Sequence, residues 1–268
     1  MYSTLYNKHN YLLDDQKFLL SNYIREYDLS KANISVLYAS KVIDEDTYNR
    51  LLVSDKMDRE IEIGKMIRKD SSIQDTLSKG IIEAKRLLFE ANQIQDNEVL
   101  SIKNDAVFII GRPLYNTVFL NGLLTFNNKN NYNSYYRLGT YEYYGYNIND
   151  VYDIDIKGMG SKRSLHEKYM IDFFKYCFYM AEQVNIREIL DLVKGFYTDY
   201  VCLKLANGYY RPLNSERYLL RNMLQYCPPQ EVDEVREEDK KYIDISYNLN
   251  ILRELHQCYS TVYFNKRR

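Results

Sequence analysis

Apolar and polar residues follow a helical period over the first third of the chain, from about residue 14 to residue 92. In the segment 73–92 apolar residues recur at every third or fourth position, which predicts one long amphipathic helix. Shorter helices are expected before it, because an aspartate just ahead of a helix accepts hydrogen bonds from free backbone N–H groups. These helices are expected to start at Asp14 or Asp15 (carrying Phe18 and Leu19), at Asp44 and near Asp58.

The period changes to that of β-strands after residue 98. The segment Glu98 to Ile110 contains two apolar strands separated by Asn104-Asp105, residue types that favour a tight turn. Residues 117–157 continue with short stretches rich in Tyr and Val, which suit pleated surfaces. The Asn-rich segment NNKNNYN, residues 127–133, is expected to be a turn between two of these strands.

Beyond residue 160 the pattern is helical again. Apolar stripes predict helices around 170–181 and 186–200, and a last helix is expected from about Asp239 to Tyr263. Helices, then strands, then helices indicate the α+β class, with a central antiparallel hairpin and meander. The expected division is a mixed region at 1–160 and a helical region at 161–268, with one single domain as the alternative.

Charge and hydropathy narrow the list of partners. The 36 basic and 37 acidic residues nearly cancel, so a nucleic-acid site has to be a local patch. No apolar run approaches the ~18–20 residues that span a bilayer, and the N-terminus has no basic-then-apolar export signal. We therefore expect a cytoplasmic protein with no membrane partner.

Cysteine and histidine usage argues against several chemistries. The four cysteines stand alone in apolar or helical settings, and the three histidines are far apart in the sequence. This spacing does not suggest a zinc site, and no Ser-His-Asp or Cys-His arrangement stands out. Catalysis, if present, needs another set of residues.

The chain has 29 tyrosines, no tryptophan and abundant Asn, Lys and Ile. The codons for Tyr, Asn, Lys and Ile are AT-rich, so the usage indicates an AT-rich genome such as that of a bacteriophage. Tyrosine serves cores, protein interfaces and base stacking alike. The tyrosine content therefore leaves the function open.

Two aspartates could carry metal-dependent chemistry. Nucleotidyl transfer by two Mg²⁺ ions needs carboxylates a few ångströms apart. Asp28 lies in REYDLSKANISVL, and Asp105 lies in VLSIKNDAVFII at the expected turn between two strands. Between them, DREIEIGKMIRKD places Lys65, Arg68 and Lys69 on one helical face that could meet phosphates.

These segments resemble the palm motifs of DNA polymerases. DLSKANIS resembles motif A in its family-A form, which would make Asp28 a metal-binding acid and place Asn33 near the sugar-discriminating position. SIKNDAVFII resembles motif C, with Asp105 as its metal-binding acid. The DIDIKG stretch faintly resembles the segment after motif C in family-B enzymes, where a lysine near Lys157 would contact the primer. The resemblance covers about a third of the chain.

The sequence also departs from the palm pattern. Ala106 follows Asp105, where palm hairpins commonly place a second acidic or polar residue, and neither motif B nor exonuclease motifs are found. The resemblance therefore implies either a minimal palm with two metal-binding acids or a palm descendant that has lost catalysis. Mg²⁺ or Mn²⁺ would be the cofactor of an active form.

Simpler interpretations exist for the same residues. Asp28 could cap a helix beginning near Ser30, and Asn104-Asp105 could serve only the turn. The three basic residues after Asp58 could be a solvated helix face. On these grounds we expect a phage replication-associated protein with a palm-like core that binds DNA, RNA or nucleotide. The alternative is a non-enzymatic phage structural, assembly or host-interaction protein whose tyrosine-rich surface binds a phage or host protein.

Overall fold

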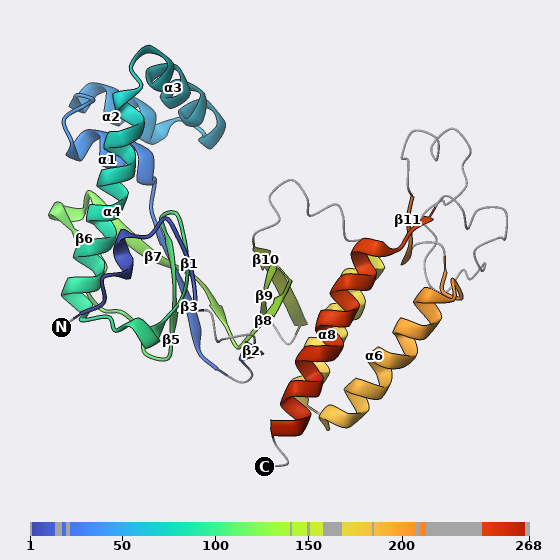
Figure 1. Ribbon diagram of the computed structural model, residues 1–268. Coiled ribbons are helices and arrows are strands. Elements are labelled where there is room, and N and C mark those ends of the chain that lie inside the picture. The colour runs from blue at the N-terminus through green and yellow to red at the C-terminus, as the bar shows by residue number, and fades with distance from the viewer. Residues whose placement is uncertain are drawn as a thin grey trace. The chain divides into compact units, whose positions relative to one another are not determined.

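The computed structural model describes residues 2–13, 18–19, 22–139, 141–148, 151–157, 168–183, 185–206, 209–212 and 243–265. The protein is α+β, as the sequence predicts (Figure 1). Its contacts divide the chain into two compact units. The first comprises Met1–Gln16 and Asn22–Asn131, and the second comprises Lys17–Ser21 and Tyr132–Arg268. The division expected after residue 160 falls within the span of the second unit.

The first unit is built on a six-stranded sheet with the order β1-β4-β5-β3-β7-β6. Strand β3 pairs antiparallel with β5, and β5 pairs antiparallel with β4 in a hairpin closed by a two-residue turn. The strands are β1 (Asn10–Leu12), β3 (Ile24–Leu29), β4 (Val99–Lys103), β5 (Ala106–Ile110), β6 (Val118–Phe119) and β7 (Leu124–Tyr132).

Four helices connect β3 to β4 in this unit: α1 (Ala32–Ala39), α2 (Glu45–Val53), α3 (Lys56–Lys69) and α4 (Ser72–Asn92). The Asp44 side chain accepts a hydrogen bond from Thr47 N at the start of α2, which confirms the expected cap. The helix near Asp58 is confirmed too, although Asp55 caps it. Short 3₁₀ turns complete the unit at η1 (Leu5–Asn7), η2 (Asp96–Glu98) and η3 (Leu120–Gly122).

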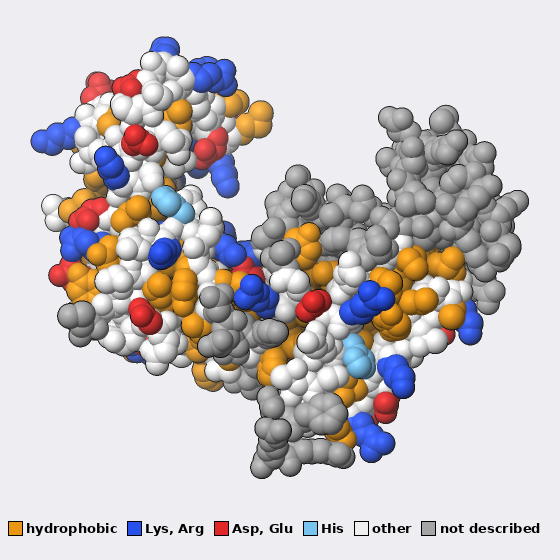
Figure 2. All heavy atoms as spheres, viewed as in Figure 1, with side chains coloured by type: hydrophobic (Ala, Val, Ile, Leu, Met, Phe, Trp, Pro, Cys, Tyr) orange, Lys and Arg blue, Asp and Glu red, His pale blue; other side chains and the backbone are white. Residues whose placement is uncertain are grey.

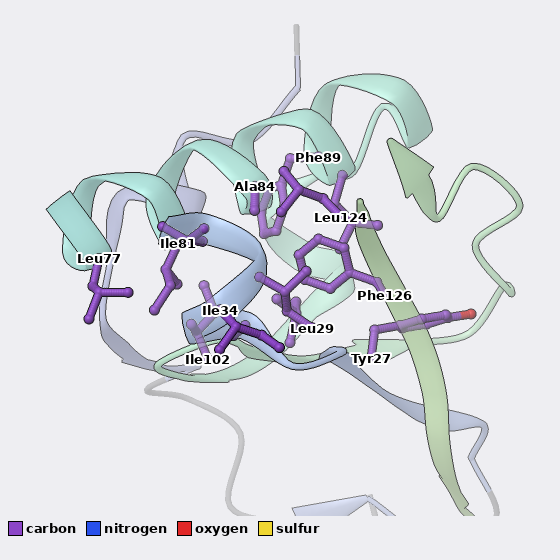
Figure 3. Packing of buried hydrophobic residues seen from close by; sticks show 14 of the residues in the cluster. Tyr27, Leu29, Ile34, Leu77, Ile81, Ala84, Phe89, Ile102, Leu124 and Phe126 are labelled. Atoms are coloured by element: carbon purple, nitrogen blue, oxygen red, sulfur yellow. The ribbon is translucent and has the colours of Figure 1, made fainter. Parts of the chain in front are cut away.

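The core of the first unit lies between the sheet and helix α4 (Figure 3). Leu77, Ile81 and Phe89 extend from α4 toward the sheet, which contributes Leu29 and Phe126, and all five are buried. This stripe is the one that the sequence predicts for residues 73–92. Because strand side chains alternate between faces, Glu26 and Asp28 of β3 lie on the sheet face opposite the core.

In its described residues, the second unit combines a four-stranded antiparallel sheet, ordered β10-β9-β8-β2, with the helices α5, α6 and α8. Its core is aromatic: the Tyr136 ring stacks on Phe178 with centroids 3.9 Å apart, and Phe173 stacks on Phe196 at 3.6 Å. Its elements are β2 (Phe18–Leu19), β8 (Ser134–Leu138), β9 (Tyr141–Ile148), β10 (Val151–Lys157), α5 (Lys168–Gln183), α6 (Ile186–Val201), β11 (Arg211–Pro212), β12 (Ile243–Asp244) and α8 (Ser246–Asn265).

Three local expectations are wrong. Phe18 and Leu19 form strand β2, paired with Tyr136 and Tyr135 of β8, rather than part of a helix, and the expected cap residues Asp14 and Asp15 lie outside the described residues. The Asn-rich segment up to Tyr132 continues strand β7 rather than making a turn, and it is a neighbour of β3 in the sheet. The last helix begins at Ser246, not near residue 239, since strand β12 precedes it. In the first two cases, pairing with a strand distant in sequence overrides local preference.

Candidate functional site

Asp28 and Asp105 come together on neighbouring strands of the first unit. Asp28 lies near the end of β3, and its Cα partner on β5 is Ala106, the residue that directly follows Asp105. Facing residues of antiparallel strands have Cα atoms about 4.5–5.5 Å apart, so the two acids are near neighbours. Helix α1 begins later, with Lys31 at its N-cap and no side-chain cap, so the interpretation of Asp28 as a helix cap is wrong.

The hairpin turn that holds Asp105 is fixed by local geometry. Asn104 adopts the left-handed region with φ 56°, which asparagine tolerates better than most residues. Its backbone N–H donates to the carbonyl oxygen of His9 at 2.6 Å. Asp105 is therefore held at the end of the hairpin, partly buried, beside strand β3.

The electrostatics of Asp105 reflect this position. Burial raises the pKa of Asp105, and the negative charge of Asp28 raises it further. The positive charges of Lys85 and Lys129 act in the opposite direction. The two carboxylates repel each other in a partly buried position. A divalent cation bound between them would relieve this repulsion.

Lys129 links the acids of β3 to strand β7. Its Nζ lies 3.6 Å from Asp28 Oδ2 and 3.9 Å from Glu26 Oε1, and its side chain is half exposed. Glu26 is buried and also accepts a hydrogen bond from Asn130 Nδ2 at 3.0 Å. The sheet face opposite the core thus carries both acids and a cation on adjacent strands.

Lys85 approaches the pair from helix α4. It is fully buried, and its Nζ donates to the carbonyl oxygen of Lys8. Burial lowers the pKa of Lys85 to about 8, although the charge of Asp105 acts to raise it. Two lysines on opposite faces of the sheet, Lys85 and Lys129, therefore act electrostatically on Asp105.

Neither lysine is singled out in the sequence analysis, although Lys85 carries a signal. Lys85 occupies the position four residues after Ile81 and four before Phe89, inside the apolar stripe of α4, where a charge is unusual. Lys129 lies in the Asn-rich segment that the sequence predicts to be a turn. Its role follows only from the pairing of β7 with β3.

A cavity of about 520 Å³ in the first unit reaches the turn that bears Asp105. Its volume is in the range of small-molecule sites. Ile63, Leu77 and Ile81 give it an apolar side, and amide and carboxylate groups supply the rest. The lining residues are His9, Asn33, Glu60, Ile63, Gly64, Ile67, Gln74, Asp75, Leu77, Ser78, Ile81 and Asn104.

Of the predicted binding residues, Asn33 lines this cavity. Its Nδ2 donates to Glu60 at 3.4 Å. The basic residues of α3 do not line it: Lys65 forms an ion pair with Glu62 at 2.8 Å, and Arg68 and Lys69 are exposed. Their geometry is that of a solvated helix face.

Lys157 belongs to the second unit. Its Nζ lies 2.7 Å from Asp155 Oδ2 on strand β10. Asp155 also accepts a hydrogen bond from the Tyr132 hydroxyl at 3.0 Å. Asp153, the other acid of this strand, pairs with Lys175 at 2.8 Å. The contacts with Tyr132 and Lys175 tie β10 to its neighbours within the second unit, whereas the Lys157–Asp155 pair lies within the strand.

The cavity also contains a contact between a serine and a histidine that the sequence does not suggest. Ser78 Oγ lies 3.0 Å from His9 Nε2. Within the described chain no carboxylate forms a hydrogen bond with the His9 ring, so the third member of a catalytic triad is not in place. The pair joins the N-terminal segment to α4.

The aspartate pair fits a metal ion that arrives with a phosphate ligand. Carboxylate oxygens suit Mg²⁺ and Mn²⁺. Among the described residues no group of three or more His, Cys, Asp or Glu side chains is placed to hold a metal. Mg²⁺ is commonly held by one or two carboxylates together with substrate phosphates. The two aspartates would supply the carboxylates of such a site.

Fold and site together define an α+β protein with an acid pair on a mixed helix-and-sheet unit. The chain belongs to the family described as bacteriophage PBS1 gene 130 protein, whose model matches residues 1–259. This match supports the phage source that the residue usage suggests. No curated protein matches the chain. In the described part of the chain, no helix has the length and apolar character needed to cross a membrane.

Proposed function

We propose that this phage protein is replication-associated and binds nucleotide or nucleic acid through a palm-like core in its first unit. The observation that carries the proposal is the register of β3 on β5, which brings Asp28 beside Asp105. Polymerase palms likewise place one metal-binding aspartate at the end of a strand and another at the turn of a neighbouring hairpin. The protein would act in the host cytoplasm.

The cavity beside the turn supplies a place for the nucleoside part of a nucleotide. Amide groups of Asn33 and Asn104 offer donors and acceptors that match base or sugar edges, and the isoleucines offer an apolar wall. The lining residues that the structure describes include carboxylates but no lysine or arginine, so phosphates would lie outside the cavity. Asn104 directly precedes Asp105, so the phosphates would lie toward the acids.

The two lysines complete the proposed site. A divalent cation bound with the phosphates would neutralise Asp28 and Asp105. Lys129 is half exposed and would turn from Asp28 toward the incoming negative charge. Lys85 stays buried, where its Nζ donates to the carbonyl oxygen of Lys8, and its positive charge would favour the ionised form of Asp105.

The alternative is a non-enzymatic protein that binds a partner through a tyrosine-rich surface. Many tyrosines, however, lie inside the protein and not on its surface. Six of the largest fully buried side chains are tyrosines: Tyr135, Tyr136, Tyr143, Tyr144, Tyr200 and Tyr259. These rings build a core. We therefore favour the acid pair over the tyrosines as the functional feature.

The test compares the wild type with Asp28→Asn and Asp105→Asn, and with Asp46→Asn as an exposed control on α2. Nucleoside triphosphate binding is measured by calorimetry with Mn²⁺, and nucleotide incorporation is measured on a primed template. We expect binding by the wild type and the control, and a loss of at least about tenfold in both site variants. Incorporation would identify an active palm, whereas binding without it would identify a palm descendant that has lost catalysis. Equal binding by all four proteins, or none, would overturn the proposal.

A further inference from the structure

Two adjoining hollows run along the helix pair α6 and α8 of the second unit. One has a volume of about 330 Å³ and the other about 440 Å³, and both are lined by Lys194 and His256. Because they share these residues, they form one groove, which we call the α6–α8 groove. Its remaining lining residues are Arg187, Leu190, Asp191, Tyr197, Thr198, Arg253, Ser260 and Tyr263.

The groove follows the axes of two antiparallel helices. Tyr197, late in α6, lies with Arg253 in one hollow, whereas Arg187, early in α6, lies with Tyr263 in the other. Arg187 and Lys194 are two helical turns apart on α6, and the α8 residues recur at every third or fourth position. Each helix therefore presents one continuous stripe to the groove.

The cations of the groove have no acidic partner among the described residues. Arg187, Lys194 and Arg253 are exposed, and none forms an ion pair with a carboxylate of the described residues. Elsewhere in the protein, Arg86 and Arg112 are each paired with a glutamate. Among the described residues that line the groove, Asp191 is the one acid. Figure 2 shows Lys and Arg side chains and a histidine over these two helices.

Aromatic and hydroxyl groups alternate with these charges. Tyr197 and Tyr263 are half buried, and the Tyr197 hydroxyl accepts a hydrogen bond from Arg253 Nε at 3.4 Å. Thr198 and Ser260 add hydroxyl groups to the lining. Cations that follow a backbone beside aromatic rings are the means by which proteins bind single-stranded nucleic acid without reading sequence.

We propose that the α6–α8 groove binds the phosphate backbone of single-stranded nucleic acid. Arg187 and Lys194 are separated by about 10 Å along their helix, at 1.5 Å per residue, which matches a short run of nucleotides. Arg253 faces them from α8, and the tyrosines provide surfaces for bases. This site is separate from the aspartate pair and does not depend on it.

Fluorescence anisotropy with a labelled oligothymidylate, on the full chain over a range of salt concentrations, tests the groove. Lys194→Glu combined with Arg253→Glu should weaken binding by at least about tenfold and reduce the salt slope by about 1.4, since each phosphate contact in a single strand contributes about 0.7. Lys204→Glu is the control for a charge reversal outside the groove, because Lys204 is exposed just beyond α6 and does not line the groove. The control should change affinity less than about twofold.

Three results would overturn the groove proposal. These are no binding by the wild type, the same weakening in Lys204→Glu, and equally tight binding of a polyglutamate peptide, which would identify an acidic protein segment as the ligand. The replaced cations are exposed, so circular dichroism should show an unaltered fold.

Discussion

Asp105 lies beside Asp28 across the β3–β5 pair, where burial raises the pKa of the Asp105 carboxyl group and the negative charge of Asp28 raises it further. The chain thus places like charges together in a partly buried position, where they oppose folding. Proteins keep such arrangements chiefly at functional sites. This relationship is the physical basis of the proposed site, and it can be measured directly.

Asp28→Asn should lower the pKa of Asp105, because it removes a neighbouring negative charge. Between the ordinary value of 3.8 and the raised folded value, the folded chain binds more protons than the unfolded chain. Its free energy of unfolding therefore falls as pH rises through that window, and the variant should show a smaller fall. Carboxyl ¹³C NMR titration measures the pKa. An unchanged Asp105 titration in the variant would show that the two acids do not interact.

Lys85→Met should alter the pH dependence of stability in the alkaline range. The pKa of Lys85 is about 8 in the folded chain against an ordinary 10.5. Between these values the unfolded chain binds more protons, so the wild type should gain up to about 3 kcal/mol of unfolding free energy. Urea denaturation from pH 7.5 to 10.5 measures this gain. A gain of the same size in Lys85→Met would assign it to other groups.

Asn92→Ala should destabilise the first unit by about 2–4 kcal/mol, since it breaks a buried hydrogen-bond network. Asn92 Nδ2 donates to the carbonyl oxygens of Leu88 and Asn116, and its Oδ1 accepts from the N–H groups of Tyr115 and Asn116. Thermal and urea denaturation measure the loss. Asn49→Ala, at an exposed position of α2, is the control and should stay within about 0.5 kcal/mol of the wild type. Equal stability of both variants would show that the network contributes nothing.

Gly145→Ala should destabilise the second unit, because a Cβ on strand β9 would overlap the Tyr152 hydroxyl and Ser134 Oγ. These two groups hydrogen-bond each other at 2.7 Å, and the overlap would separate them. We expect a loss of about 2 kcal/mol or more. Gly195→Ala on α6 meets open space and should instead stabilise by about 0.5–1 kcal/mol. Denaturation midpoints that move in the same direction for both variants would contradict the packing described.

The parts of the fold that the sequence predicts are those decided by local pattern. The stripe of α4 and the Asn104-Asp105 hairpin follow from spacing and turn chemistry within short segments. Strands β2 and β7 follow from pairing with partners far along the chain. Phe18 joins β8 in the second unit although it lies between segments of the first. Neighbouring residues carry no signal of such a pairing.

The candidate site likewise has features that the sequence predicts and features that depend on distant pairing. The sequence indicates the two aspartates and the type of segment that holds each, but the pairing that joins them depends on the strand order of the whole sheet. Lys129 reaches Asp28 through the same strand order. The basic helix face was the least informative feature, because Lys65 is satisfied by Glu62 on its own helix.

The most direct test of the central claim is the binding of Mn²⁺, measured by electron paramagnetic resonance in the presence of a nucleoside triphosphate. The wild type and Asp46→Asn should bind the ion with equal affinity. The combined Asp28→Asn and Asp105→Asn variant, which relieves charge repulsion and should remain folded, is expected to lose at least about tenfold. Equal Mn²⁺ affinity in the wild type and the combined variant would contradict the assignment of this pair as a metal site.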